Sequence, residues 1–289
     1  MTTGSDALCG ETPAPRVIAT DLDGTLLRSD GTVSPRTARA LRRAEDAGLS
    51  VVFVTARPPR WIEALREYVG GHGTVIAGNG AFVMDLLSGT VEEYGFDGAA
   101  LLTVARALRD AFPDVGLAVE RRTGMAREVA FASPHGEDAL TRTVPLLEHL
   151  DDLDEVPTGK LLAAVPDHAG SDFLDAVSSA VGEQGIVAYS GVGHLAEISA
   201  PGVTKAAALA RWCEERGVGS EAVWAFGDMP NDLPMLAWAG VSFAMASGHP
   251  EVIAAASHGC PANDEDGVAA VIEALLTRSR LEGTSWKGS

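Results

Sequence analysis

The sequence predicts an α/β protein with a doubly wound, Rossmann-like parallel-sheet core and an inserted α+β domain. Near both ends of the chain, short apolar strands alternate with amphipathic helices. Continuous apolar strands are typical of a parallel sheet that helices cover on both faces. Between about residues 81 and 189 the strands instead alternate apolar and polar residues. That alternation indicates a second sheet with one solvated or ligand-facing side.

The first part of the predicted core follows the order strand, helix, strand, helix, strand. An apolar run begins at Val17, and Gly24 ends it. A helix starts at Ser34-Pro35, because serine suits the N-cap and proline the first helical position, and Gly48 ends it. The remaining predicted elements are the strand Ser50–Val54, a helix with Trp61, Ile62, Leu65 and Tyr68, and the strand Val75–Ala77.

We expect the core to comprise residues 16–81 and 188–279, with the inserted domain at 82–187. Residues 1–15 and 280–289 are predicted to be a flexible lead-in and a loose tail. The inserted domain is predicted to contain strands at Thr90–Tyr94, Val115–Glu120, Ala126–Phe131 and Lys160–Val165 and helices at 97–112, 138–150 and 168–183. The second part of the core is predicted to contain strands at His194–Ser199, Ala222–Phe226 and Val241–Met245 and helices at Val203–Arg216 and Gly267–Arg278.

Composition narrows the possible partners. The chain has 289 residues, and 22 basic against 40 acidic residues give a net charge of −18. Such an acidic surface disfavours nucleic acid and anionic membranes as partners. Cys9, Cys213 and Cys260 are widely spaced and form no CxxC pair, which favours a reducing compartment. With no apolar run of membrane-spanning length, the sequence predicts a cytoplasmic protein and leaves a monomer and a homodimer open.

Polar residues follow several of the predicted core strands. Ligands of open parallel sheets bind at the carboxyl ends of the strands, so we expect these residues to meet there. Carboxylates can act as a nucleophile and bind a hard divalent cation such as Mg²⁺, while a hydroxyl and an ammonium stabilise phosphoryl oxygens. Taken alone, Asp21-Leu-Asp23-Gly could also be a plain strand-ending turn. The residues in question are Asp21, Asp23, Thr55, Asp228, Asn231 and Asp232, with Lys205 at the start of a helix.

These segments resemble the four motifs of the haloacid dehalogenase-like hydrolase superfamily, and the pattern is most similar to its Cof-type phosphatases. The resemblance covers residues 16 to about 278. About 150 residues separate the second motif from the third, which places the additional domain as a cap after the third strand, as in Cof-type enzymes. In order, the matching segments are Asp21-Leu-Asp23-Gly24-Thr25, Val54-Thr55-Ala56-Arg57, Pro201-Gly-Val-Thr-Lys205 and Gly227-Asp228-Met-Pro-Asn231-Asp232.

The resemblance implies a role for each matching residue. Asp21 would be the nucleophile and a metal ligand, and Asp23 the general acid and base, with its backbone carbonyl on the metal. Asp228 would bind Mg²⁺ directly, with Asn231 and Asp232 behind it. Thr55 and Lys205 would be catalytic as well as contacting the substrate. The implied substrate contacts are Thr55, Ala56, Arg57, Asn79, Lys205 and Asn231.

Three points stay open at this stage. Arg57 could bind substrate or simply pair with acidic residues at the surface. Glu120-Arg121-Arg122 in the cap could meet an anionic leaving group, although we expect an exposed run of charges. Relatives usually carry Gly-Asn-Ala after the last strand, where this chain has Ser247-Gly248-His249, which puts an ordering role of that asparagine in doubt.

The implied function is a magnesium-dependent phosphoric monoester hydrolase that works through an aspartyl-phosphate. Its partner would be a small phosphorylated metabolite, such as a sugar phosphate. Alternatives that use the same residues are a phosphotransferase or mutase acting on sugar phosphates, and a sugar-phosphate sensor without turnover. The sequence does not identify the substrate, because cap loops vary without a readable code.

Overall fold

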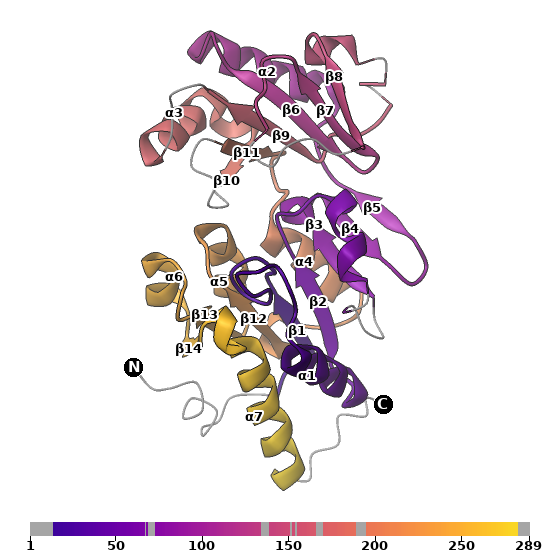
Figure 1. The fold of residues 1–289 in the computed structure, drawn as a ribbon, viewed down its shortest axis with the longest axis vertical. Coiled ribbons are helices and arrows are strands. Elements are labelled where there is room, and N and C mark those ends of the chain that lie inside the picture. The colour runs from indigo at the N-terminus through magenta and orange to yellow at the C-terminus, as the bar shows by residue number, and fades with distance from the viewer. Residues whose placement is uncertain are drawn as a thin grey trace.

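A computed structural model describes residues 14–66, 68, 73–133, 139–150, 152–153, 155–165, 170–188 and 195–282. Most of the predicted lead-in, 1–15, and of the predicted tail, 280–289, lies outside these residues. The described chain forms two sheets, one above the other in Figure 1, each with its own helices. None of the helices in these ranges is long and apolar enough to cross a membrane.

The larger sheet has eight strands in the order β14-β13-β12-β1-β2-β3-β4-β5. The six strands from β14 to β3 are parallel, and β4 and β5 add an antiparallel hairpin at one edge. This confirms the predicted parallel core sheet. The strands are β1 (Val17–Thr20), β2 (Ser50–Val54), β3 (Thr74–Ala77), β4 (Phe82–Asp85), β5 (Val91–Glu93), β12 (Val223–Gly227), β13 (Val241–Met245) and β14 (His258–Cys260).

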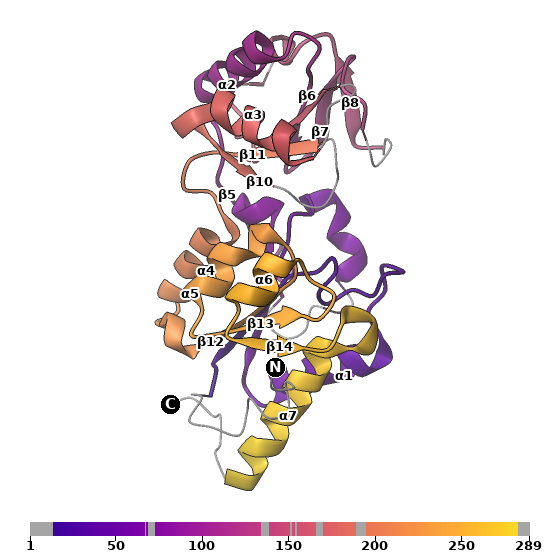
Figure 2. The same cartoon turned by 90° about the vertical axis from the view of Figure 1, so that its left-hand side faces the viewer.

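Helices cover both faces of the larger sheet. Consecutive residues of β1 point to opposite faces, so Ile18 packs in one apolar cluster and Val17 and Ala19 in the other. The Ile18 side holds α1 (Pro35–Asp46) and α7 (Gly267–Glu282). The other side holds α4 (Lys205–Glu214), α5 (Leu233–Trp238) and α6 (Pro250–Ala255), and Figure 2 shows α4 and α5 at the left of the sheet with α1 at the right.

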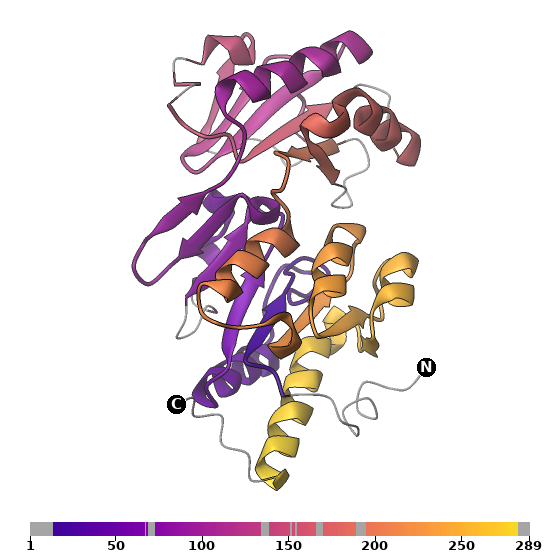
Figure 3. The same cartoon turned by 180° about the vertical axis from the view of Figure 1, so that it is seen from behind.

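The smaller sheet, which we call the cap sheet, has the strand order β10-β11-β9-β6-β7-β8. Its pairings are antiparallel except for β7 with β8. Two helices, α2 (Gly98–Ala111) and α3 (Ser171–Val181), pack on its outer face, as Figure 3 shows from behind. The strands are β6 (Gly116–Arg121), β7 (Gly124–Glu128), β8 (Thr141–Val144), β9 (Lys160–Ala164), β10 (Ile186–Ala188) and β11 (Leu195–Ser199).

Sheet membership differs from the predicted domain limits at both ends of the insertion. The β4–β5 hairpin falls within the predicted insertion 82–187 but pairs with β3 of the larger sheet. Strand β11 was expected in the core but pairs with β9 and β10 of the cap sheet. Strand pairing is a long-range property, and the apolar pattern of a strand does not reveal its partner.

Two predicted helices are wrong. The segment containing Trp61 and Leu65 forms two short 3₁₀ helices, η1 (Pro59–Trp61) and η2 (Glu63–Leu65). The predicted helix 138–150, whose residue 138 lies outside the described residues, is instead β8 followed by η4 (Leu147–His149). Pro145 explains this, because proline in a helix interior removes a backbone donor. The other 3₁₀ turns are η3 (Gly78–Gly80), η5 (Gly182–Gln184), η6 (Ser220–Ala222), η7 (Pro230–Asp232) and η8 (Asn263–Glu265).

Candidate active site

The first motif leaves the sheet at its centre, where β1 lies between β2 and β12. Asp21 follows β1, its backbone N–H donates to the Phe226 carbonyl at 3.0 Å, and its side chain is buried. Gly24 turns the chain with φ of 77°, a conformation that glycine adopts without strain. A Cβ atom at Gly24 would lie 2.2 Å from Asp228 Oδ2. Gly24 therefore brings its backbone, with no side chain of its own, directly against the carboxylate of Asp228.

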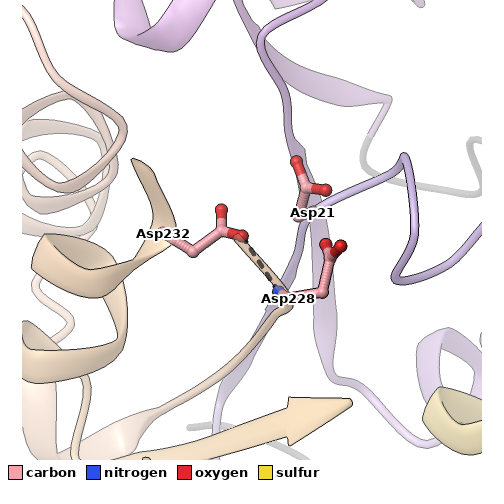
Figure 4. A group of neighbouring side chains, drawn as sticks. All are labelled: Asp21, Asp228 and Asp232. Atoms are coloured by element: carbon pink, nitrogen blue, oxygen red, sulfur yellow. Dashed lines mark hydrogen bonds between the residues drawn. The ribbon is translucent and has the colours of Figure 1, made fainter. Parts of the chain in front are cut away.

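The fourth motif follows the neighbouring strand β12. The Asp228 carboxylate accepts a hydrogen bond from Thr25 Oγ1 at 2.7 Å. Asp232 Oδ2 accepts from the backbone N–H groups of Asp228 and Met229, each at 3.0 Å. Figure 4 shows Asp21, Asp228 and Asp232 converging, with the Asp232–Asp228 bond dashed. One carboxylate oxygen from each of the three lies within 4.8 Å of the others.

Lys205, the first residue of α4, joins these two motifs. Thr204 caps the helix by accepting the Ala207 N–H at 3.1 Å. The Lys205 ammonium is buried, 2.5 Å from Asp21 Oδ1 and 2.7 Å from Asp232 Oδ1. A cation at a helix N-terminus is disfavoured by the helix dipole, and here two carboxylates compensate it.

The protonation of the cluster reflects its burial. Burial opposes the charged form of Lys205, but Asp21 and Asp232 outweigh it and raise the pKa of the ammonium. Burial is the main cause that raises the pKa of Asp21, with Lys205 acting against it. Burial also raises the pKa of Asp228 to about 6, although the hydrogen bond from Thr25 acts to lower it. Three carboxylates facing one ammonium therefore need further positive charge to ionise together.

A hard divalent cation fits this need. Mg²⁺ prefers oxygen ligands, and the cluster offers carboxylate oxygens from Asp21 and Asp228 that face one another. Both oxygens of Asp232 already accept hydrogen bonds, from Lys205 and from two backbone N–H groups. The donor set therefore suits a metal bound by Asp21 and Asp228, with Asp232 supporting them from behind.

Asp23 lies apart from this cluster, on the cavity side. Its carboxylate is more than half exposed and accepts both Arg57 Nη2 at 2.6 Å and Arg57 Nε at 2.8 Å. The structure thus places Arg57 against an acid of the protein, although Arg57 also lines the cavity. Thr55 is fully buried, and its hydroxyl oxygen accepts the Arg57 N–H at 3.1 Å. Thr55 therefore helps to shape the loop that carries Arg57.

Asn79 and Asn231 connect the strand ends on the opposite side. Asn79 adopts φ of 57° in η3, and its N–H donates to the Thr55 carbonyl at 2.9 Å. Its side-chain oxygen accepts from Asn231 Nδ2 at 3.4 Å, and its amide nitrogen donates to Glu197 at 2.9 Å. Asn231 Oδ1 is a buried acceptor without a hydrogen-bond partner. Asn231 lines the cavity, whereas Asn79 lies behind it.

A cavity of about 470 Å³ separates the two sheets at this point. Its core side, the cavity floor, includes Asp21, Asp23, Arg57 and Lys205, together with Ala56, Pro58, Trp61, Met229 and Asn231. Its other side, which we call the cap roof, consists of Glu120, Lys160, Leu162, Leu195 and Glu197. These five residues come from β6, β9 and β11. The predicted ligand-facing side of the second sheet is thus the face toward the core.

The structure of the cap roof contradicts the expected exposed run of charges at Glu120-Arg121-Arg122. It also shows cavity-lining residues that lie outside the four motifs. Glu120 and Arg121 are buried instead of forming an exposed run, because β6 lies inside the cap sheet. Glu120 pairs with Arg60 of η1, and Arg121 pairs with Asp152 on the other side of the strand. Lys160 is also buried, in an otherwise apolar strand. A charged residue within such a strand is the signal that could have identified it.

The segment Ser247-Gly248-His249, where this chain differs from the usual family sequence, lies directly beside Asp228. The His249 N–H donates to the Asp228 carbonyl at 2.7 Å. A Cβ atom at Gly248 would lie 3.0 Å from that same carbonyl oxygen. In this chain the loop therefore supports the fourth motif through its backbone.

Comparison with known proteins agrees with this geometry. A family model described as haloacid dehalogenase-like hydrolase matches residues 18–272. The chain is 29% identical over 266 residues to the 5-amino-6-(5-phospho-D-ribitylamino)uracil phosphatase YitU of Bacillus subtilis, covering 88% of this chain and 95% of that protein. It is 27% identical to a phosphoglycolate phosphatase of Methanothermobacter thermautotrophicus, covering 90% and 99%.

The solved structures include a haloacid dehalogenase-like hydrolase from Bacteroides thetaiotaomicron, similar with a TM-score of 0.73 at 26% identity. The match covers 90% of this chain and 98% of that one. The family model spans most of the chain, including all four motifs and the insertion between them. The chain therefore belongs to the haloacid dehalogenase-like hydrolases, and the resemblance to their Cof-type phosphatases is confirmed.

Proposed function

We propose that this protein is a magnesium-dependent phosphatase that hydrolyses small phosphate monoesters, such as sugar phosphates, through an aspartyl-phosphate on Asp21. The observation that carries the proposal is the meeting of Asp21, Asp228 and Asp232 around the buried ammonium of Lys205. Two relatives that are named as phosphatases match almost the whole chain, and this similarity supports the same reaction class.

In this mechanism Asp21 attacks the phosphorus atom in line with the leaving oxygen. Asp23, which lies on the cavity side of the same loop, protonates the departing alkoxide. It then takes a proton from the water that attacks the acyl-phosphate. The pairing with Arg57 holds the Asp23 carboxylate at the floor of the cavity. Each carboxylate of the first motif thus has a separate task.

Lys205 and the backbone around Thr55 would bind the phosphoryl oxygens. The ammonium of Lys205 touches Asp21, so it lies where negative charge develops during attack. The hydroxyl of Thr55 accepts one hydrogen bond and keeps its own proton for a phosphoryl oxygen. Ala56, Arg57 and Asn231 complete the floor against which the phosphate lies.

Asp21, Asp228 and the Asp23 carbonyl would hold the metal, with Asn231 and Asp232 behind them. A bound Mg²⁺ supplies charge that screens the phosphate from the carboxylates and orients its oxygens. Gly24 leaves Asp228 Oδ2 accessible from the first motif, since any side chain there would overlap it. The cap sheet excludes bulk water from the cavity and contacts the leaving group.

Phosphate release from p-nitrophenyl phosphate tests this proposal. We expect activity with Mg²⁺, loss of activity with EDTA, and loss in Asp21→Asn, which keeps the shape but removes the nucleophilic charge. Phosphate transfer to an added sugar, or binding without turnover, would contradict the hydrolase assignment. Unchanged magnesium-dependent release by Asp21→Asn would contradict the nucleophile assignment.

A further inference from the structure

The charged residues around the cavity fall into two groups with different net charge. At the floor, the lining residues Asp21 and Asp23, with Asp228 and Asp232 directly behind them, face two cations. Those cations are Lys205, which pairs with Asp21 and Asp232, and Arg57, which pairs with Asp23. One divalent cation therefore makes the floor neutral, and the substrate phosphate then brings the negative charge that the catalytic groups bind.

The cap roof, counted together with Arg60 of η1, which pairs with Glu120, is already neutral without a ligand. The Lys160 ammonium donates to Glu197 Oε2 at 2.8 Å and to the Ala56 carbonyl at 2.9 Å. Glu120 pairs with Arg60, and both side chains are about 5% exposed. Glu197 also accepts the Asn79 amide at 2.9 Å. Among the residues that the structure describes here, each roof cation thus already faces a carboxylate.

This arrangement has a consequence for the leaving group. A second negative charge beside the roof would meet two buried carboxylates and, within the described part of the chain, no surplus cation, in a region of low effective dielectric. A hydroxyl group, by contrast, can donate to those carboxylates without a charge penalty. The remaining roof surface, Leu162 and Leu195 with Trp61 opposite, suits uncharged carbon.

Building on the proposed phosphatase function, we propose that the cap roof selects phosphate esters whose leaving group carries no second negative charge. Glu120 and Glu197 are the residues that set this preference. The selected class comprises hydroxylated or otherwise uncharged leaving groups, and the disfavoured class comprises carboxylated or doubly phosphorylated ones. Glu120 and Glu197 thus act on specificity, apart from the phosphoryl chemistry at the floor.

A matched pair of substrates tests the proposal. 2-Hydroxyethyl phosphate and 2-phosphoglycolate have the same carbon chain and differ in a hydroxymethyl against a carboxylate group. We expect kcat/KM of the wild-type protein to be at least about tenfold higher for 2-hydroxyethyl phosphate. When each compound competes with p-nitrophenyl phosphate, 2-hydroxyethyl phosphate should have the lower inhibition constant. Equal values, or a preference for 2-phosphoglycolate, would overturn the proposal.

Two variants locate the preference in the roof. Glu120→Gln removes the Glu120 carboxylate from Arg60, and Glu197→Gln removes the Glu197 carboxylate from Lys160. Each variant should shift the kcat/KM ratio toward 2-phosphoglycolate by about tenfold, because taking one negative charge from the roof lowers the repulsion of the substrate carboxylate. The ratio of two substrates on one preparation is independent of the fraction of folded protein. An unchanged ratio in both variants would overturn the assignment of these residues.

Glu128→Gln is the matched control. Glu128 is a buried carboxylate of the same sheet, paired with Arg109 of α2, and it lies on the helix-covered face. The same substitution there should leave the substrate ratio unchanged, and an equal shift would overturn the roof assignment. Loss of all hydrolysis, including that of p-nitrophenyl phosphate by the wild-type protein, would instead refute the proposed phosphatase function.

Discussion

The floor and the roof of the cavity use buried charge in different ways. At the floor, Asp21 and Asp232 share one ammonium, and Asp228 adds a third carboxylate. At the roof, Glu120 and Glu197 each pair with a cation of their own. A group of carboxylates short of positive charge needs a metal ion, whereas a balanced set of pairs needs none. In the function that we propose, this contrast separates the residues that perform chemistry from those that recognise the rest of the substrate.

Changing Lys205 should give the largest effect, because it is the only described cation that contacts both Asp21 and Asp232. Lys205→Met should lower kcat by at least about a hundredfold, the scale for losing one donor to transition-state charge. Phosphate release under saturating substrate measures this. Removing one partner of a buried ion pair should also lower the free energy of unfolding, by about 3 kcal/mol. A kcat within a factor of two of the wild-type value would contradict the role of Lys205.

Gly24→Ala should weaken Mg²⁺ binding. Its Cβ atom would lie 2.2 Å from Asp228 Oδ2, in a backbone conformation with positive φ. We expect Mg²⁺ affinity to fall by about tenfold or more, since misplaced ligands and their supporting groups cost that much. Activity titrated against Mg²⁺ measures the change. Gly31→Ala, also at positive φ but with open space around it, controls for backbone strain alone.

The pH dependence of metal binding follows from Asp228. Its pKa is raised from 3.8 to about 6 in the metal-free protein, so the folded state binds a proton more tightly than the unfolded state. Carboxylate ligands must lose their proton to bind a cation, so Mg²⁺ affinity should fall about tenfold per pH unit below pH 6. Calorimetric titration with Mg²⁺ over about three pH units, from about pH 5 to about pH 8, measures this. A constant affinity across this range would contradict the assignment of Asp228 as a ligand.

Lys160→Met tests the roof in the same assays. It removes the ammonium from Glu197 and the contact to the Ala56 carbonyl, so we expect kcat/KM to fall by about tenfold. Mg²⁺ affinity should stay unchanged, in contrast to Gly24→Ala, because Lys160 contacts no residue of the carboxylate cluster. Equal losses of metal affinity in the two variants would remove the distinction between floor and roof.

The smallest effect is expected at His249, where this chain departs from the usual family segment. His249 supports Asp228 through its backbone N–H, which His249→Ala retains. Its side chain caps α6 by accepting the Glu251 N–H at 3.3 Å. We therefore expect a loss of at most about 1 kcal/mol of stability and Mg²⁺ affinity within twofold of the wild-type value. Thermal unfolding and Mg²⁺ titration measure both quantities.

The floor could be predicted from the sequence because its residues lie in short segments at strand ends. The turn at Gly24, the cap at Thr204 and the order of the parallel strands are local or follow from apolar patterns, and together they bring Asp21 and Asp228 to one edge. The fold class followed from the same patterns. The family resemblance supplied the separate roles of Asp21 and Asp23.

The roof could not be predicted in this way. Glu120, Lys160 and Glu197 lie far apart in the sequence and meet only through the pairing of β6, β9 and β11. The charge of Lys160 in an apolar strand marks that residue, but the sequence does not show which carboxylate it pairs with or that the pair lines a cavity. Pairing across the cap sheet, and the limits of that sheet, are set by tertiary packing and not by local propensity.

Trapping the phosphorylated intermediate tests the central claim most directly. Borohydride reduction of the protein during turnover of p-nitrophenyl phosphate, followed by peptide mass spectrometry, should show conversion of Asp21 to homoserine. Asp23 and Asp228 should remain unmodified in the same digest. Reduction at another aspartate, or turnover without any trapped aspartyl-phosphate, would contradict the account.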